Sequence, residues 1–85
     1  MDELRKRQKI ISQLVEARLE QGISQAELAR RLGIQRSGIN RLESGTQNPT
    51  LDMILKIASA LGKDVSLELN DKEEPMSNVY SLRIY

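Results

Sequence analysis

The chain has 85 residues, a length that predicts a single small domain with a modest core. It contains neither cysteine nor histidine, which excludes disulfides, thiolate metal sites and the commonest general base. No apolar run approaches the roughly 20 residues of a membrane span and no signal-peptide pattern opens the chain, so we expect a cytoplasmic protein without a membrane partner.

The net charge of +1 is divided unevenly along the chain. Residues 1–61 contain ten lysines and arginines against seven aspartates and glutamates, whereas residues 62–85 contain three against five. The first part therefore has a balance of +3 and the second a balance of −2. Positive charge in the first part fits a nucleic-acid partner, and it fits ordinary solvated surface charge equally well.

Glycines punctuate the apolar periodicity of the first part of the chain. Gly22, Gly33, Gly45 and Gly62 each follow an apolar-periodic segment, where a left-handed residue commonly ends a helix. The pattern predicts helices at about 3–20, 24–32, 35–44 and 50–61.

The first predicted helix combines an apolar stripe with a cluster of positive charge. The stripe consists of Leu4, Ile10, Ile11, Leu14, Val15 and Leu19. The cluster consists of Arg5, Lys6, Arg7 and Lys9. We interpret this cluster as a solvated face, with phosphate contact as the alternative.

The second predicted helix has the clearest start signal. Ser24 and Glu27 match the S-x-x-E capping box, in which each side chain accepts a backbone N–H of the first turn. Ile23 and Leu28 have the spacing of a hydrophobic staple. The residues expected to face inward are Ala26, Leu28, Ala29 and Leu32.

The third and fourth predicted helices differ in apolar content. The third has few inward residues, namely Ile34, Ile39 and Leu42. The fourth begins at the N-cap candidate Thr50 and is the most apolar, so we expect it to form the core. Its apolar positions are Leu51, Ile54, Leu55, Ile57, Ala58 and Leu61.

The pattern changes after Gly62. Residues 65–69 alternate with period two and predict a short β-strand, residues 70–75 form a polar linker, and residues 76–85 alternate again. A single strand cannot satisfy its own backbone, so it needs a partner. That partner is the second alternating segment, the same strand of another copy, or a different protein.

Two short helices joined by a glycine-containing turn match the helix-turn-helix motif. The segment SQAELARRLGIQRSGINRLESG also resembles the motif of the phage-repressor and Cro-like (XRE-like) class of DNA-binding domains. The matching positions are Gln25, Ala26, Leu28, Ala29, Gly33, Ile39, Leu42, Glu43 and Gly45. The resemblance implies an all-α, compact bundle of four to five helices that contains the helix-turn-helix. We therefore expect a DNA-binding domain over residues 1–62, a strand over 63–69 that contributes to a dimer contact, and a tail over 70–85.

The resemblance also assigns roles to individual residues. The base-contacting positions it implies are Arg36, Ser37, Asn40 and Arg41. The phosphate-contacting positions are Ser24, Gln25, Gln35 and Thr46. Arg18 and Glu43 fall where many members place a partly buried ion pair. No metal or cofactor is implied.

Two positions depart from the family pattern. Gln35 stands where Ser or Thr usually caps the recognition helix, and Gln is a poorer cap. Gly38 lies inside that helix, where a glycine lowers helix stability by about 1 kcal/mol relative to Ala. Both indicate a helix weakly held in the free protein, or, for Gly38, a close helix crossing.

The resemblance implies a sequence-specific repressor that acts as a homodimer on a pseudo-palindromic site in double-stranded DNA. The segments around residues 13–33 and 48–69 are also similar to antitoxins of the HigA type, which neutralise a toxin protein and repress their own operon. The alternatives are a stand-alone phage-type or restriction-modification controller regulator and a protein-interaction module on the same scaffold. An enzyme is not expected, because no catalytic constellation is present.

Overall fold

The computed structural model describes residues 2–71, and this part of the chain contains four helices. They are α1 (Asp2–Glu20), α2 (Gln25–Leu32), α3 (Arg36–Glu43) and α4 (Leu51–Ala60). Their bounds lie within one residue of the predicted ranges. The all-α class and the helical bundle with its helix-turn-helix are therefore confirmed, and the predicted segment 76–85 lies outside the described residues.

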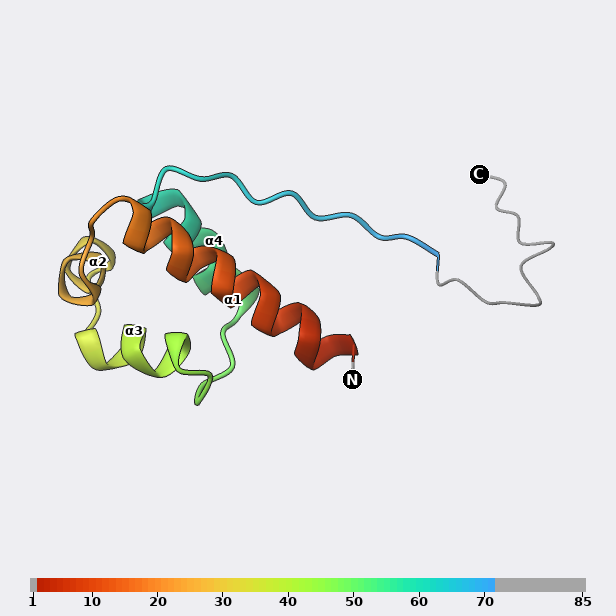
Figure 1. Ribbon diagram of the computed structural model, residues 1–85, viewed down its shortest axis with the longest axis horizontal. Helices are drawn as coiled ribbons and strands as arrows, with labels where there is room; N and C mark the ends of the chain where they lie inside the picture. The colour runs from red at the N-terminus through yellow and green to blue at the C-terminus, as the bar shows by residue number, and fades with distance from the viewer. Residues whose placement is uncertain (1, 72–85) are drawn as a thin grey trace.

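The helices surround one small apolar core. α2 packs against both α3 and α4, and α1 packs against α3. The most deeply buried large side chains are Leu28, Ile39 and Ile57, one from each of the three shorter helices. α1 is the longest helix, and its N-terminal turns extend past the others (Figure 1).

Backbone geometry at the glycines follows the prediction. Gly22, Gly33, Gly45 and Gly62 all have positive φ, between 68° and 81°. At Gly33 this conformation turns the chain from α2 to α3, and the amide N–H of Ile34 donates to the carbonyl of Ala29 at 3.0 Å. The turn satisfies a carbonyl at the end of α2 that the helix itself leaves unpaired.

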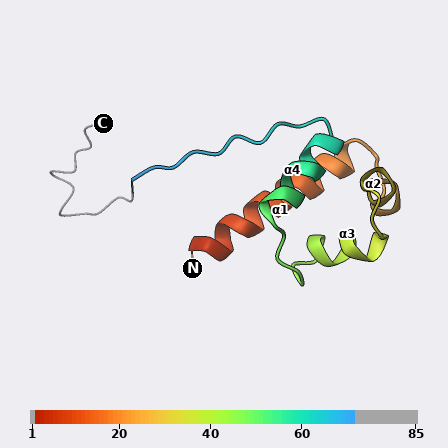
Figure 2. The ribbon, with the colours of Figure 1, turned by 180° about the vertical axis from the view of Figure 1, so that it is seen from behind.

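The β-strand predicted over residues 65–69 does not form within the single chain. Residues 63–71 form neither helix nor strand, and they leave α4 along an extended path (Figures 1 and 2). Val65 packs against the core, whereas the following residues are exposed. A strand is defined by backbone hydrogen bonds to a neighbour, and the described residues offer this segment no neighbouring strand.

Several apolar residues expected in the interior lie on the surface instead. They are Leu4, Leu19, Ala26, Leu51 and Leu55. In α1 the first core residue is Ile11, so Leu4 lies two turns beyond the reach of the neighbouring helices. Four short helices cover only part of each apolar stripe, so the flanks of the stripes stay exposed.

Candidate nucleic-acid interface

Helix α3 has one buried side and one polar, exposed side. Ile39 and Leu42 anchor the buried side and are only 1% and 4% exposed. The four positions expected to contact bases, Arg36, Ser37, Asn40 and Arg41, are all exposed. The fold thus presents two guanidinium groups, a hydroxyl and an amide outward from a helix held by its other face.

An ion pair between α1 and α3 holds the C-terminal end of α3. The Arg18 Nε donates to Glu43 Oε2 at 2.7 Å and Nη2 donates to Oε1 at 2.8 Å, which makes the pair bidentate. Arg18 Nη1 also donates to the carbonyl of Ile23 at 2.8 Å, and Arg18 is only 7% exposed. Charge-assisted bonds in fixed geometry orient α3 against α1.

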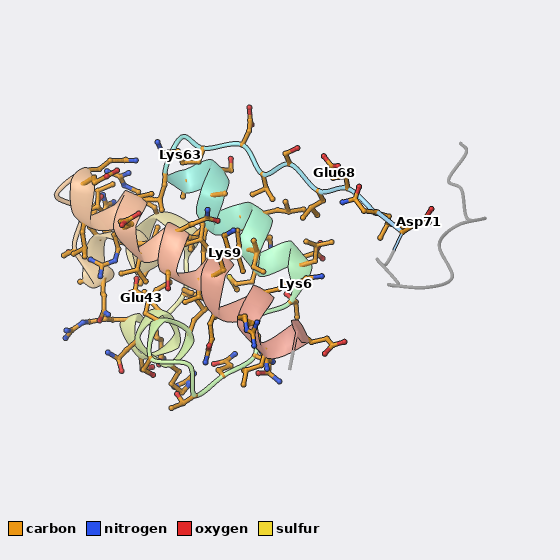
Figure 3. The ribbon with its side chains drawn as sticks, turned by 45° about the vertical axis from the view of Figure 1, so that its right-hand side comes forward. Lys6, Lys9, Glu43, Lys63, Glu68 and Asp71 are labelled. Atoms are coloured by element: carbon orange, nitrogen blue, oxygen red, sulfur yellow. The ribbon has the colours of Figure 1, made fainter. Side chains whose placement is uncertain are left out.

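Gln25 extends this network from the first residue of α2. Its Nε2 donates to Glu43 Oε1 at 2.9 Å, and its Oε1 lies 3.4 Å from Asn40 Nδ2. Side chains of α1, α2 and α3 therefore meet at Glu43, which Figure 3 labels. Sequence reasoning did not anticipate the Gln25–Glu43 bond, because the two residues are 18 positions apart and only the crossing of α2 and α3 joins them.

The loop after α3 carries a second group of polar side chains. Thr46 Oγ1 donates to the carbonyl of Arg41 at 3.2 Å, and Arg41 Nε donates to Gln47 Oε1 at 3.1 Å. Gln47 was not among the expected site residues. Its position directly after Thr46, a predicted phosphate-contacting residue, could have identified it. The loop therefore continues the polar surface of α3.

A helix-turn-helix family model matches residues 14–67, more than half of the chain. The chain belongs to the helix-turn-helix family. The matched range includes residues 14–20 of α1, all of α2, α3 and α4, and the start of the extended segment.

Relatives occur in bacteria and archaea. A helix-turn-helix transcriptional regulator of Haemophilus influenzae is 38% identical over 58 residues, which cover 68% of this chain and 59% of the relative. A regulator of the same description from Methanothermobacter thermautotrophicus is 45% identical over 49 residues, 58% of this chain and 71% of the relative. A third, from Archaeoglobus fulgidus, is 38% identical over 60 residues, 69% of this chain and 86% of the relative. No solved structure matches the chain significantly.

In this helix-turn-helix the two helix starts differ in how they are capped. Ser24 Oγ accepts the backbone N–H of Glu27 at 3.0 Å, whereas the side chain of Gln35 makes no cap hydrogen bond to α3. Gln35 is exposed and is thus available to another molecule. The start of α3 has unpaired backbone donors, which suit a phosphate oxygen.

The expected capping box is only half formed. The Glu27 carboxylate binds Arg30 at 2.6 Å and Arg31 at 3.0 Å instead of the backbone N–H of Ser24. Hydrogen bonds from Arg30 and then Arg31 lower the pKa of Glu27 to about 2. Two cations within one turn attract the carboxylate more strongly than a single peptide dipole, so the reciprocal half of the box is lost.

Gly38 is not required by a close helix crossing. A Cβ built at this position would meet only Ile34 Cδ1, at 3.7 Å, which is ordinary van der Waals contact. Of the two interpretations of Gly38, the structure thus favours a helix that is weakly held in its own right.

Two further findings concern residues 2–71. None of their helices combines the length and the apolar character that crossing a bilayer requires. Nor do these residues gather three or more acidic side chains into a cluster that could hold a metal ion.

Proposed function

We propose that the chain is a DNA-binding transcriptional regulator that recognises base sequence with α3 in the major groove. The observation that carries this proposal is the orientation of α3, with Ile39 and Leu42 inward and Arg36, Ser37, Asn40 and Arg41 outward. Membership of the helix-turn-helix family and the names of the relatives support it. A helix of this diameter fits the major groove, which is about 12 Å wide.

The side chains of α3 suit particular base edges. A guanidinium can bind guanine bidentately and an amide can bind adenine, each for about 1–3 kcal/mol of discrimination. Ser37 and Arg41 are one helical turn apart and so face the same groove. We assign base contacts to Arg36, Ser37, Asn40 and Arg41.

We assign the phosphate contacts to residues near the two ends of α3 and at the start of α2. Ser24 and Gln25 start α2, Gln35 starts α3, and Thr46 follows its end. Gln25 is already bonded to Glu43, so its remaining amide hydrogen and the exposed backbone donors of α2 are what a phosphate would meet. Such contacts position the protein on the duplex without distinguishing sequences.

A titration of the chain with selected and random duplexes at several salt concentrations tests the proposal. The slope of log affinity against log salt reports how many phosphates the protein neutralises, and the ratio of the two affinities measures specificity. Arg41→Ala should reduce the ratio, whereas Gln25→Ala should weaken binding to both duplexes alike. A chain that binds neither duplex at low salt would instead be a protein-interaction module.

We propose that the regulator acts as a homodimer through residues 65–69. One module makes few contacts, and two recognition helices about 34 Å apart can bind a pseudo-palindromic site together. Leu67 is 66% exposed and Leu69 is fully exposed, on an extended segment without a strand partner within residues 2–71. Pairing with the same segment of a second copy would cover both the side chains and the backbone edge.

Sedimentation of paired variants tests the dimer. Leu67→Asp should shift the chain towards the monomer, whereas Ser66→Asp, which places the same charge on the alternate face, should not. An unchanged dimer in Leu67→Asp, or a monomeric wild-type chain at high concentration, would contradict this assignment.

The finer biological role that we propose is that of an antitoxin which represses its own operon. The support is the similarity of residues 13–33 and 48–69 to antitoxins of the HigA type. A toxin partner would bind outside the DNA-contacting face. Co-purification of a co-expressed small basic protein at fixed stoichiometry would support this role, and a homodimer that binds DNA without such a partner would indicate a stand-alone regulator.

A further inference from the structure

The first turns of α1 carry four cations that the site described above does not use. Arg5, Lys6, Arg7 and Lys9, here the α1 basic cluster, precede the first core residue, Ile11. Arg5, Lys6 and Lys9 are exposed, and Arg7 is half-buried. These turns therefore add little to the core, and the side chains of Arg5, Lys6 and Lys9 face water.

One hydrogen bond ties this part of α1 to the polar loop that follows α3. Arg7 Nη1 donates to Asn48 Oδ1, across 41 positions of the sequence. Asn48 directly follows Gln47, which in turn accepts from Arg41 of α3. Arg7, the member of the α1 basic cluster that makes this bond, thus joins the first turns of α1 to the surface formed by α3 and its loop.

The overall arrangement agrees with this hydrogen bond. The N-terminal end of α1, α3 and the loop after α3 lie along the same lower edge of the molecule in two opposite views (Figures 1 and 2). Lys6 lies on this part of α1, whereas Lys63 lies on the opposite side, where the chain leaves α4 (Figure 3). The acidic residues Glu68 and Asp71 lie on the extended segment that leaves α4, away from the α1 basic cluster (Figure 3).

Cations outnumber carboxylates in the first turns of α1, where Asp2 and Glu3 stand against the four residues of the α1 basic cluster. Positive charge at a helix N-terminus opposes the macrodipole, and cations on successive turns repel one another. The three ion pairs found among residues 3–71 involve Arg18, Arg30 and Arg31, and none includes the cluster. A polyanion beside these turns would relieve both effects.

We propose that the α1 basic cluster binds phosphates of the same duplex, beyond the base pairs that α3 contacts. The inference rests on the proposed DNA-binding function and extends its binding surface by one helix. Because lysine and arginine on an exposed helix meet phosphates as charges, this interaction is independent of base sequence. It lengthens the protected stretch of DNA and raises affinity without raising specificity.

Single neutralising variants test the inference in the full chain. Arg5→Gln, Lys6→Gln and Lys9→Gln are compared with Lys63→Gln, which removes the same charge on the opposite side. For each cation that binds a phosphate, its neutralisation should reduce the salt slope by about 0.9 and weaken binding up to about eightfold at 0.1 M salt. Selected and random duplexes should weaken equally, and Lys63→Gln should change neither quantity.

Thermal unfolding without DNA supplies a second measurement. In it the same variants should gain stability, although they lose affinity for DNA. Removal of Arg5 or Lys6 should raise the melting temperature slightly, because α1 loses an unfavourable charge at its N-terminus. A variant that is more stable yet binds DNA less tightly cannot be explained by loss of structure. If the cluster variants bind DNA and depend on salt as Lys63→Gln does, this inference is overturned while the proposed function stands. If the wild-type chain binds no duplex, the proposed function itself fails.

Discussion

Loss of the Glu43 carboxylate should destabilise this small domain more than any surface change. In Glu43→Ala the guanidinium of Arg18, only 7% exposed, loses both bonds to the carboxylate. It keeps the carbonyl of Ile23 as its protein partner. Gln25 Nε2 loses its acceptor in the same step.

The magnitude follows from these hydrogen bonds. Two hydrogen bonds between charged groups contribute about 1.5–3 kcal/mol each, and an ion left buried without its partner costs about 3–5 kcal/mol. Since a domain of this kind has a free energy of unfolding of about 5–15 kcal/mol, the loss is a large share of its stability. For a chain of this length it corresponds to a fall in melting temperature of at least about 12 °C.

Thermal and urea unfolding followed by circular dichroism measure the loss. The matched control is the double variant Arg18→Met/Glu43→Leu, which removes both charges and fills the space with apolar groups. Replacing a buried ion pair in this way is often close to neutral, so the double variant should be more stable than Glu43→Ala. If Glu43→Ala loses less than about 1 kcal/mol, or the double variant is the less stable of the two, the pair does not hold α3 as described.

Three further predictions concern the glycines and the surface ion pairs. Gly38→Ala should raise the free energy of unfolding by about 0.5–1 kcal/mol, because the new methyl group meets only Ile34 at 3.7 Å in a helical backbone; a loss measured by urea titration would contradict this. Gly33→Ala should instead lower the free energy of unfolding by about 1–2 kcal/mol. The space around Gly33 is open, but its φ of 71° strains any residue with a side chain. Equal stability of the two alanine variants would refute this distinction. The lowered pKa of Glu27, about 2 against 4.5, means that its contribution to stability is fully present above about pH 4.5 and is lost as the pH falls towards 2. The melting temperature of Glu27→Gln should therefore depend less on pH than that of the wild-type chain in this range, and parallel curves would count against the ion pairs.

The helices and the motif could be predicted from the sequence because their signals are local. A capping serine, apolar residues at helical spacing and a glycine at each helix end act within a few residues, so Ser24, Leu28 and Gly33 were sufficient to place α2. The interior was predicted less well. Leu51 and Leu55 have the spacing of a core stripe, yet whether another helix covers them depends on packing.

The polar network around Glu43 was likewise predicted in part from the sequence and decided in part by packing. Family resemblance predicted the Arg18–Glu43 ion pair and, separately, a phosphate contact at Gln25, but the bond from Gln25 to Glu43 depends on how α2 and α3 pack against each other. The half-formed capping box has a similar origin. Its pattern was correct, but Arg30 and Arg31 compete for Glu27 once the helix brings them one turn away.

Local chemistry along the chain alone determined where helices begin and end, which class of domain they form, and which polar side chains populate the third helix. Only the tertiary structure decided that Gln25 joins Arg18 at the Glu43 carboxylate, that residues 65–69 have no strand partner within residues 2–71, and that the basic turns of α1 lie beside the loop after α3. The reason is physical: capping and helical periodicity act over one or two turns, whereas ion pairs, strand pairing and a continuous charged surface join residues that become neighbours only when the helices pack.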